Sequence, residues 1–245
     1  MNAIVVTGTG TEVGKTIVTA AIAALARAAG KSVAVVKLAQ TGIEPGDESD
    51  VDVVSRLSGV DDIHELVRYP EPLAPATAAR RAGVDAVPVV ALTARVRELA
   101  DRDLVVVEGA GGLLVHLDDD GGTVADVARD LDAPVVVVAA AGLGTLNAIA
   151  LTAEALDRRG VRCLGVVIGS WPAAPDLAMK TNLDDIADYA NAPLLGRPPA
   201  GAAGLDPDEF RETARRHLAP ALGGAWTYSP DAEIRSDREE TAAPT

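Results

Sequence analysis

Cysteine, histidine and aromatic residues are scarce in this chain of 245 residues, which has one cysteine, three histidines, two tryptophans, three tyrosines and one phenylalanine. A single cysteine, Cys163, excludes an internal disulfide. Its position in an apolar run predicts a buried core residue. The histidines are scattered and form no pair with the spacing of metal ligands. We therefore expect neither a disulfide-bonded scaffold nor a metal site built from Cys and His.

Positive charge is outweighed by negative charge. The chain has 22 lysines and arginines against 36 aspartates and glutamates, so its net charge is −14. That charge repels nucleic acid unless a basic patch is present, and no basic cluster stands out in the sequence. No apolar run is long enough to cross a membrane, and no secretory signal is visible. We expect a soluble cytoplasmic protein with no nucleic-acid or membrane partner.

Hydrophobic residues make up 48% of the chain, and they fall in two alternating patterns. Runs typical of buried strands recur at Ile4–Thr7, Ser32–Lys37, Leu104–Glu108, Pro134–Ala139, Cys163–Gly169 and, weakly, Pro193–Leu195. Helical spacing is found at Lys15–Ala29, Val51–Leu57, Val89–Ala100, Val124–Asp130, Leu146–Arg158, Asp176–Ala190 and Pro207–Leu218. This alternation predicts an α/β fold with a doubly wound, mainly parallel sheet and helices on both faces. Ligands bind such sheets beyond the carboxyl ends of the strands.

The end of the first strand carries the clearest functional signal. Gly8, Gly10 and Gly14 form a loop between that strand and a helix that starts at Lys15. The backbone N–H groups of such a loop and of the helix N-terminus bind phosphate. Lys15 adds a cation, and the hydroxyl of Thr16 is a suitable ligand for Mg²⁺. These residues predict a P-loop that holds the phosphates of a nucleotide.

The glycine spacing of this loop departs from the strict Walker form. That form has a glycine five residues before Gly14, where this chain has Thr9, and Gly8 stands one place earlier. A dinucleotide-binding turn fits less well, because its third glycine would fall at Val13. An ordinary glycine-rich turn is the structural alternative. The coincidence of strand, loop, Lys-Thr pair and helix favours the phosphate loop.

Two further strand ends carry charged residues. Lys37 ends the second strand, which we expect beside the first, and Thr41 follows it as a hydroxyl donor. With Lys15 nearby, Lys37 is interpreted as a second cation aimed at a transferred phosphoryl group rather than a solvated side chain. Glu108 ends the third strand and precedes the glycine-rich run 109–112. Phosphoryl-transfer sites place an acid at such a position to hold Mg²⁺ or its water shell.

An acidic cluster and a second glycine-rich turn leave alternatives open. Asp47, Glu48, Asp50 and Asp52 precede a short helix, where most of them are expected to be solvated N-terminal charges. One of the four can reach the metal, but the spacing does not select it. The run 141–147 follows a strand and opens a helix. It is either an anion site suited to a carboxylate or an ordinary turn with Thr145 as N-cap.

Together these segments resemble the dethiobiotin synthetases, the ATP-dependent carboxylases of biotin synthesis. The similarity extends from Ile4 to about Phe210 and rests on Thr7–Thr16, Lys37–Gly42, Glu108–Leu114, Gly142–Asn147 and Gly169–Pro172. The P-loop alone would also fit a regulatory ATPase of the ParA or MinD type, which is the alternative function. Those proteins have a signature lysine at the place of Gly10, and MinD has a basic C-terminal helix where this chain is acidic.

The resemblance implies a homodimeric ligase that uses ATP and Mg²⁺. Its substrates would be 7,8-diaminononanoate (7,8-diaminopelargonate) and CO₂, and its products dethiobiotin, ADP and phosphate, with carbamate and carbamoyl phosphate intermediates. After Ala225 the chain becomes acidic and poor in apolar residues, so we expect a single P-loop domain over 1–225 and an acidic, flexible tail over 226–245. Lys15 and Lys37 would be catalytic. The metal ligands would be Thr16, Glu108 and Asp50, which aligns better than Asp47.

The resemblance also implies which residues bind the ligands. The nucleotide phosphates and their metal would contact Glu12, Val13, Gly14, Lys15, Thr16, Ile17, Asp50, Glu108, Gly109, Ala110 and Gly111. The base would lie near Gly169, Ser170, Pro199, Ala200 and Gly201. The diamine end would contact Thr11, Lys37 and Thr41, and the substrate's carboxylate would reach the partner subunit at Leu143, Gly144, Thr145 and Asn147. This match favours the anion site over the ordinary turn.

Three positions depart from the family pattern. Lys37 is followed by Leu-Ala rather than Pro-Val, which changes the stiffness of the loop. Gly10 replaces an aspartate found in many members, so one carboxylate near the metal is lost. Gly169 and Ser170 stand where many members have an asparagine that reads adenine. We therefore expect relaxed base selectivity.

Overall fold

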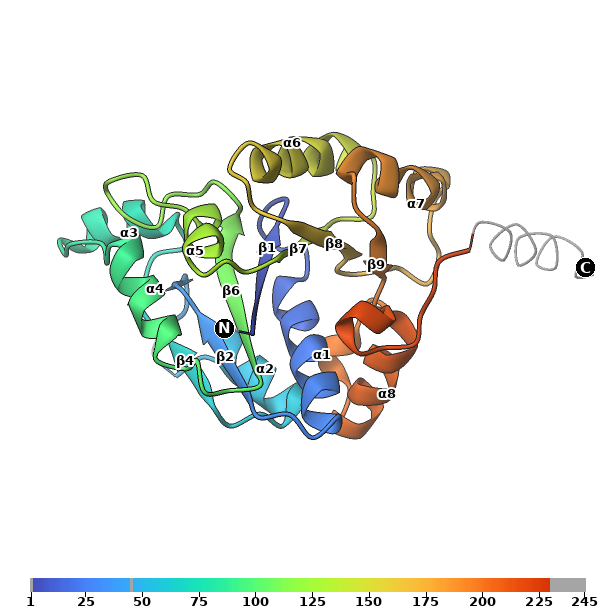
Figure 1. Cartoon of the computed structure of the whole chain (residues 1–245), viewed down its shortest axis with the longest axis horizontal. Helices are drawn as coiled ribbons and strands as arrows, with labels where there is room; N and C mark the ends of the chain where they lie inside the picture. Colours follow the sequence, from blue (N-terminus) through green and yellow to red (C-terminus); the bar gives the residue numbers. More distant parts are fainter. Residues whose placement is uncertain (1, 45, 230–245) are drawn as a thin grey trace, which may run out of the picture.

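Seven strands build the main sheet in the order β4-β2-β6-β1-β7-β8-β9, and each neighbouring pair is parallel (Figure 1). The computed structural model describes residues 2–44 and 46–229. The strands are β1 (Ala3–Gly8), β2 (Val33–Lys37), β4 (Ile63–Glu65), β6 (Leu104–Gly112), β7 (Val135–Ala139), β8 (Cys163–Ile168) and β9 (Leu194–Gly196). The predicted α/β class and parallel sheet are confirmed, and the weak strand signal at Pro193–Leu195 corresponds to β9.

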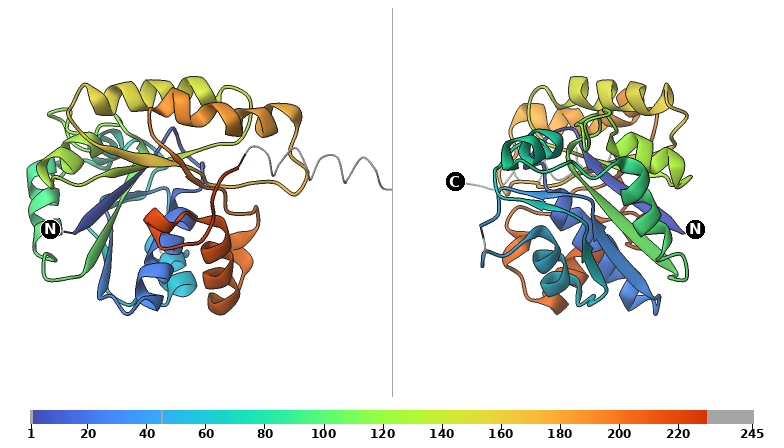
Figure 2. Two further views of the ribbon diagram at one scale, coloured as in Figure 1. Left: turned by 45° about the vertical axis from the view of Figure 1, so that its right-hand side comes forward. Right: turned by 90° about the vertical axis from the view of Figure 1, so that its left-hand side faces the viewer.

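Helices cover both faces of the sheet, as predicted (Figure 2). One face packs against α1 (Lys15–Ala28), α2 (Asp50–Ser58) and α8 (Pro207–His217). The other packs against α4 (Val89–Arg97), α5 (Val124–Asp130), α6 (Thr145–Asp157) and α7 (Leu177–Ala190). Short 3₁₀ turns, η1 (Ala202–Gly204) and η2 (Pro220–Leu222), flank α8.

Valine-rich strands make this layered core possible. Val5 and Val6 of β1 point to opposite faces, and each is fully buried in a different one of the two apolar clusters. All five residues of β2 and of β7 are buried as well. Strands buried on both faces need continuous apolar runs, and β-branched side chains suit such runs. The functional loops are therefore attached to a rigid sheet.

The expected neighbour of the first strand is corrected by the sheet order. We expected the second strand beside the first, but β6 lies between β1 and β2. β6 is also longer than predicted, because it continues past Glu108 and pairs Gly112 with Gly8 after an irregularity in the register. The central position of β6 brings Glu108 close to loops from both flanking strands.

The sequence patterns missed most of the short elements, β9 being the exception. β3 (Gln40–Thr41) and β5 (Arg68–Tyr69) form a separate two-stranded parallel sheet, and α3 (Pro75–Ala82) begins at a proline in its first turn. Strands of two or three residues, including β4, are too short to show a periodicity. The proline-rich segment 69–75 lies outside the main sheet, as prolines favour, and its first residue, Tyr69, belongs to β5.

The chain continues along the core after residue 225. Trp226 and Tyr228 pack against the apolar cluster beneath α6 and α7, and the Tyr228 hydroxyl donates a hydrogen bond to Asp184 Oδ1 at 2.5 Å. Most of the predicted acidic tail, residues 230–245, lies outside the described residues. The division at residue 225 and the flexibility of the tail stay predictions.

Candidate nucleotide and metal site

The P-loop joins β1 to α1 and is held by close backbone packing. Gly14 adopts φ +96° and forms the N-cap of α1. A Cβ atom at Gly14 would lie 2.6 Å from the carbonyl oxygen of Gly169, so the loop abuts the end of β8. Only glycine tolerates both this φ and this contact. The N-terminus of α1 is thereby left open toward the carboxyl end of the sheet, as phosphate binding requires.

Lys15 folds back over its own loop. Its Nζ donates to the Gly10 carbonyl oxygen at 2.9 Å, and the residue is only 7% exposed. Burial lowers the pKa of Lys15, and the positive charge of Lys37 lowers it further. Both lysines therefore face one region, as the sequence predicted.

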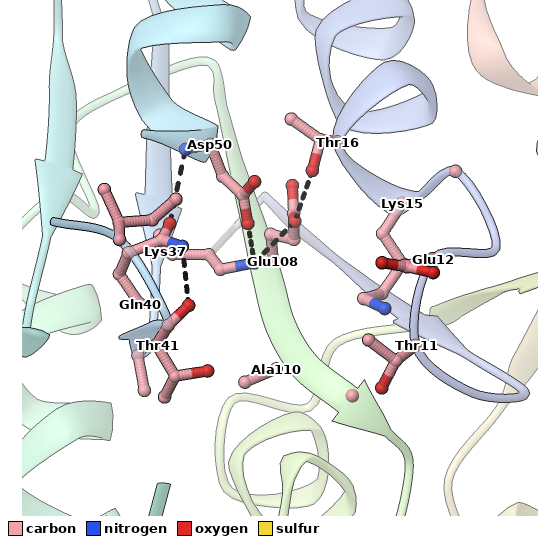
Figure 3. Close-up of a pocket in the computed structure, with 14 residues that line it drawn as sticks. Thr11, Glu12, Lys15, Thr16, Lys37, Gln40, Thr41, Asp50, Glu108 and Ala110 are labelled. Carbon is pink, nitrogen blue, oxygen red and sulfur yellow. Dashed lines mark hydrogen bonds and ion pairs between the residues drawn. The ribbon is translucent and has the colours of Figure 1, made fainter. Parts of the chain in front are cut away.

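Lys37 lies between two carboxylates (Figure 3). Its Nζ is 2.5 Å from Asp50 Oδ2 and 2.7 Å from Glu108 Oε1. Burial by itself lowers the pKa of Lys37, but the charges of Glu108 and Asp50 outweigh burial and the pKa is raised. Lys37 is thus held as an ammonium group inside the protein, with 4% of its surface exposed.

Glu108 links this cluster to the P-loop. It is 1% exposed, and its Oε1 accepts a hydrogen bond from the Thr16 hydroxyl at 3.1 Å as well as one from Lys37. Asp50 and Glu108 therefore contact one ammonium group, and the Thr16 hydroxyl joins them through Glu108. Asp47, the reserve metal ligand, is exposed and does not line the cavity.

This oxygen set fits Mg²⁺. Mg²⁺ typically takes one or two carboxylates and keeps water and phosphate oxygens as its other ligands. The described residues contain no group of three or more His, Cys, Asp or Glu arranged to hold a metal. A fully protein-built metal cage is therefore not found in that part of the chain, whereas two carboxylates and a hydroxyl beside a phosphate loop suit a nucleotide-bound Mg²⁺.

Two adjoining cavities open at this edge. The first, of about 400 Å³, is lined by the residues just described and by Thr11, Glu12, Gln40, Thr41, Ala110 and Gly111. The second, of about 510 Å³, shares five of these, Thr11, Glu12, Thr41, Ala110 and Gly111. Its remaining wall is mostly apolar and comes from Gly42, Pro72, Leu73, Ala74, Pro75 and Val115. A polar chamber thus continues into an apolar one.

The residues predicted near the base come together from two segments. Trp171 N donates to the Pro198 carbonyl oxygen at 2.8 Å, and Ala200 N donates to the Trp171 carbonyl oxygen at 2.7 Å. The turn at 169–171 therefore lies beside 198–201, and Gly169 touches the P-loop through Gly14. The Arg197 guanidinium stacks 4.8 Å from the centre of the Trp171 ring. Val13 and Ile17 pack on the core beneath the loop.

The segment predicted to bind the substrate's carboxylate lies apart from both cavities. Leu143 is 91% exposed, and none of Leu143, Gly144, Thr145 and Asn147 lines either cavity. Gly144, not Thr145, is the N-cap of α6, and the Thr145 hydroxyl donates to the Ala140 carbonyl oxygen at 2.6 Å. The capped-turn alternative is therefore wrong about Thr145.

Sequence reasoning gave no role to Gln40 or to the 72–75 wall. Gln40 is buried and lines the first cavity, and Pro72 and Leu73 line the second. Gln40 lies within the Lys37–Gly42 segment. Its polar side chain beside a charged strand end is the signal that could have marked it as a site residue. Nothing in the local sequence of 72–75 indicates that this segment folds back to line the second cavity.

Fold and site together define a P-loop nucleotide-binding protein of the NTPase type. Two solved structures share this fold. MinD of Pyrococcus furiosus matches 99% of this chain and 100% of its own chain at 18% identity and a TM-score of 0.50. Chloroplast FtsY of Physcomitrella patens matches 87% of this chain at 16% identity and a TM-score of 0.51, and this chain covers 65% of it. At these identities the likeness concerns the fold alone.

Sequence comparison is more specific. A family model described as an AAA domain matches residues 2–202. ATP-dependent dethiobiotin synthetase BioD of Saccharopolyspora erythraea is 62% identical over 93% of this chain and 100% of its own length. The BioD protein of Streptomyces coelicolor is 55% identical over 97% of this chain and 99% of its own length. The chain therefore belongs to the family of the AAA-domain model and to the dethiobiotin synthetase family of ligases.

Across 2–44 and 46–229, no helix combines the length and apolar character needed to cross a bilayer.

Proposed function

We propose that this chain converts 7,8-diaminononanoate, CO₂ and ATP into dethiobiotin, ADP and phosphate. The observation that carries the proposal is the pair of buried lysines, Lys15 and Lys37, that line a polar cavity adjoining an apolar one in a chain of this family. The reaction needs no nucleophile from the protein, because the substrate supplies both amines. It does need concentrated positive charge beside a P-loop.

The chemistry proceeds in three balanced steps. One substrate amine attacks CO₂ and loses a proton, giving a carbamate. A carbamate oxygen then attacks the γ-phosphorus of ATP and ADP leaves, which gives a carbamoyl phosphate. The second amine attacks the carbonyl carbon and loses a proton while phosphate leaves, which closes the ureido ring. Each step places negative charge on oxygens that Lys15 and Lys37 can stabilise.

Each residue group has its own task in this scheme. The P-loop residues 12–17 hold the nucleotide phosphates. Thr16, Asp50 and Glu108 hold Mg²⁺, which neutralises phosphate charge when it is bound. Lys37 holds the carbamate, with Thr11 and Thr41 at the diamine end. The apolar cavity accommodates the hydrocarbon chain, since it adjoins the polar one and is walled by Pro72, Leu73 and Val115.

We also propose that the protein acts as a homodimer in the cytoplasm. Leu143, Gly144 and Asn147 are exposed at the start of α6, Thr145 beside them is buried, and none of the four lines a cavity of its own chain. Their backbone N–H groups suit a carboxylate brought by a partner's substrate. The base would be read between 169–170 and 199–201, two segments that contain no side-chain amide.

One assay tests the reaction directly. Purified protein is mixed with diaminononanoate, bicarbonate, Mg²⁺ and ATP, and dethiobiotin and ADP are followed together. We expect dethiobiotin and ADP in equal amounts, with ADP release dependent on the diamine. ATP hydrolysis that ignores the diamine and yields no dethiobiotin would favour a regulatory ATPase of the MinD type, whose fold the chain shares.

A further inference from the structure

Gln40 has a buried polar side chain that the catalytic scheme leaves without a task. It is 4% exposed and belongs to the small second sheet rather than to the main one. Its Oε1 accepts a hydrogen bond from the backbone N–H of Asp50 at 3.2 Å (Figure 3). Asp50 is the first residue of α2, whose first N–H groups have no partner within the helix. The Gln40 side chain, from β3, therefore provides the acceptor for the N–H of Asp50.

The start of α2 is fixed by a second, separate device. Ser49 is the N-cap, and its side chain and that of Asp52 form a capping box. Asp52 Oδ2 accepts hydrogen bonds from Ser49 N at 2.9 Å and from Ser49 Oγ at 2.6 Å. This device stabilises the helix start but does not touch the N–H of Asp50. The two contacts can therefore be separated by mutation.

The position of Gln40 is itself set by backbone pairing. Gln40 N donates to the Val67 carbonyl oxygen at 2.9 Å, and Gln40 pairs with Arg68 across β3 and β5. The Gln40 Nε2 atom lies 3.4 Å from the Thr41 carbonyl oxygen. The two-stranded sheet thus presents the side chain of Gln40 to the helix that carries Asp50.

We infer that Gln40 is a positioning residue that aims the Asp50 carboxylate at the metal and at Lys37. The Asp50 side chain is 32% exposed, yet its Oδ2 lies 2.5 Å from Lys37 Nζ, so its direction depends on the backbone at the start of α2. Groups that orient a metal ligand from behind commonly alter metal affinity by about 10- to 100-fold. This inference rests on the proposed function, because it takes Asp50 as a ligand of the nucleotide-bound metal.

The test measures Mn²⁺ binding by electron paramagnetic resonance, with the whole chain saturated with ADP. Gln40→Met keeps the length of the side chain but removes the acceptor, and we expect Mn²⁺ to bind about 10-fold more weakly. Gln40→Glu keeps an acceptor oxygen and should bind Mn²⁺ without such a loss. If Gln40→Met does not fold, Gln40→Asn, which is too short to reach Asp50 N, takes its place.

Two matched variants separate positioning from other effects. Ser49→Ala loosens the start of α2 without touching the Gln40 contact, so it should lower the melting temperature but leave Mn²⁺ affinity near that of the wild type. In an Asp50→Asn background, Gln40→Met should cause no further loss, because Gln40 acts only through Asp50.

Three results would overturn the inference. They are wild-type Mn²⁺ affinity in Gln40→Met, an equal loss in Ser49→Ala, and an additional loss on top of Asp50→Asn. Product formation by the wild type is measured beside these titrations. If dethiobiotin forms but Gln40→Met binds Mn²⁺ normally, only the positioning role fails. If no dethiobiotin forms, the proposed function fails whatever the titration shows.

Discussion

Lys37 and Glu108 are register partners across the neighbouring strands β2 and β6, and their side chains meet at 2.7 Å. Lys37 is the last residue of β2, whereas Glu108 lies midway along the longer β6. The Glu108 carboxylate also accepts a hydrogen bond from the Thr16 hydroxyl. Glu108 therefore connects Lys37 to the phosphate loop. The lysine is therefore placed by the sheet, not by a flexible loop.

Replacing Lys37 by methionine removes the second cation. We expect turnover to fall by about 100- to 1,000-fold, the usual effect of losing one preorganised electrostatic group. The pH profile of kcat/KM should also move to higher pH, since a nearby cation lowers the pKa of the substrate amine and favours its neutral form. Steady-state kinetics from pH 6 to 9 are the measurement. The exposed Lys31→Met variant is the control, and normal turnover and pH profile in Lys37→Met would refute the role.

Lys37→Met should also lower the free energy of unfolding. Breaking a buried ion pair from one side leaves a buried charge without its partner, which typically costs about 3–5 kcal/mol. Part of that cost is offset here because Asp50 is partly exposed. In urea unfolding, Lys37→Met should therefore have a lower midpoint than the wild type, whereas the control Lys31→Met should not. A double variant with Glu108→Gln should be less destabilised than the sum of the single variants.

Gly14 and Gly10 of the P-loop differ in the space available for an added Cβ atom. Gly14→Ala places a Cβ at φ +96°, 2.6 Å from the Gly169 carbonyl oxygen, so we expect lost ADP binding and reduced stability. A Cβ at Gly10 would meet no atom within 4 Å. Gly10→Ala should thus bind ADP like the wild type. Isothermal titration with ADP and Mg²⁺ tests both, and equal binding by the two variants would contradict the packing argument.

Cys163 provides a pH-dependent prediction away from the site. Burial raises the pKa of its thiol above the ordinary value of 9.0. At a given alkaline pH the folded protein therefore holds less thiolate than the unfolded chain. Alkylation by iodoacetamide should be slow in the native state and become fast in urea, because the thiolate is the reactive form. Equal rates in both states would show that the thiol is neither shielded nor perturbed.

Base selectivity can be tested by replacing ATP with other nucleoside triphosphates. The turn at 169–170 carries no side-chain amide, and neighbouring segments contribute backbone groups near it. We expect CTP and GTP to support dethiobiotin formation beside ATP. Initial rates with each triphosphate at equal Mg²⁺ concentration test this, and strict dependence on ATP would show that another group reads adenine.

The main sheet and the charged cluster were predictable for one physical reason. Valine-rich runs such as Val135–Val138 have few alternatives to a strand buried on both faces, and parallel strands bring their carboxyl ends to one edge. Lys15, Lys37 and Glu108 follow from those two facts. The order of the strands does not, because local sequence does not record that β6 inserts between β1 and β2.

The parts that sequence reasoning missed depend on contacts between distant segments. The role inferred for Gln40 needs the pairing of β3 with β5, which covers two residues in each strand. The apolar wall at Pro72 and Leu73 needs the return of a loop that has no periodicity of its own. Asp47 and Asp50 belong to one acidic segment, and the fold places Asp50 beside Lys37 and leaves Asp47 exposed.

The contact between Gly14 and Gly169 limits how this protein can be redesigned. A side chain at residue 169 would overlap the Val13 carbonyl oxygen and press on Val138. An asparagine placed at residue 169 to add a side-chain amide for adenine recognition would therefore displace the P-loop. Engineering the choice of base in this chain requires grafting the two loops as one unit.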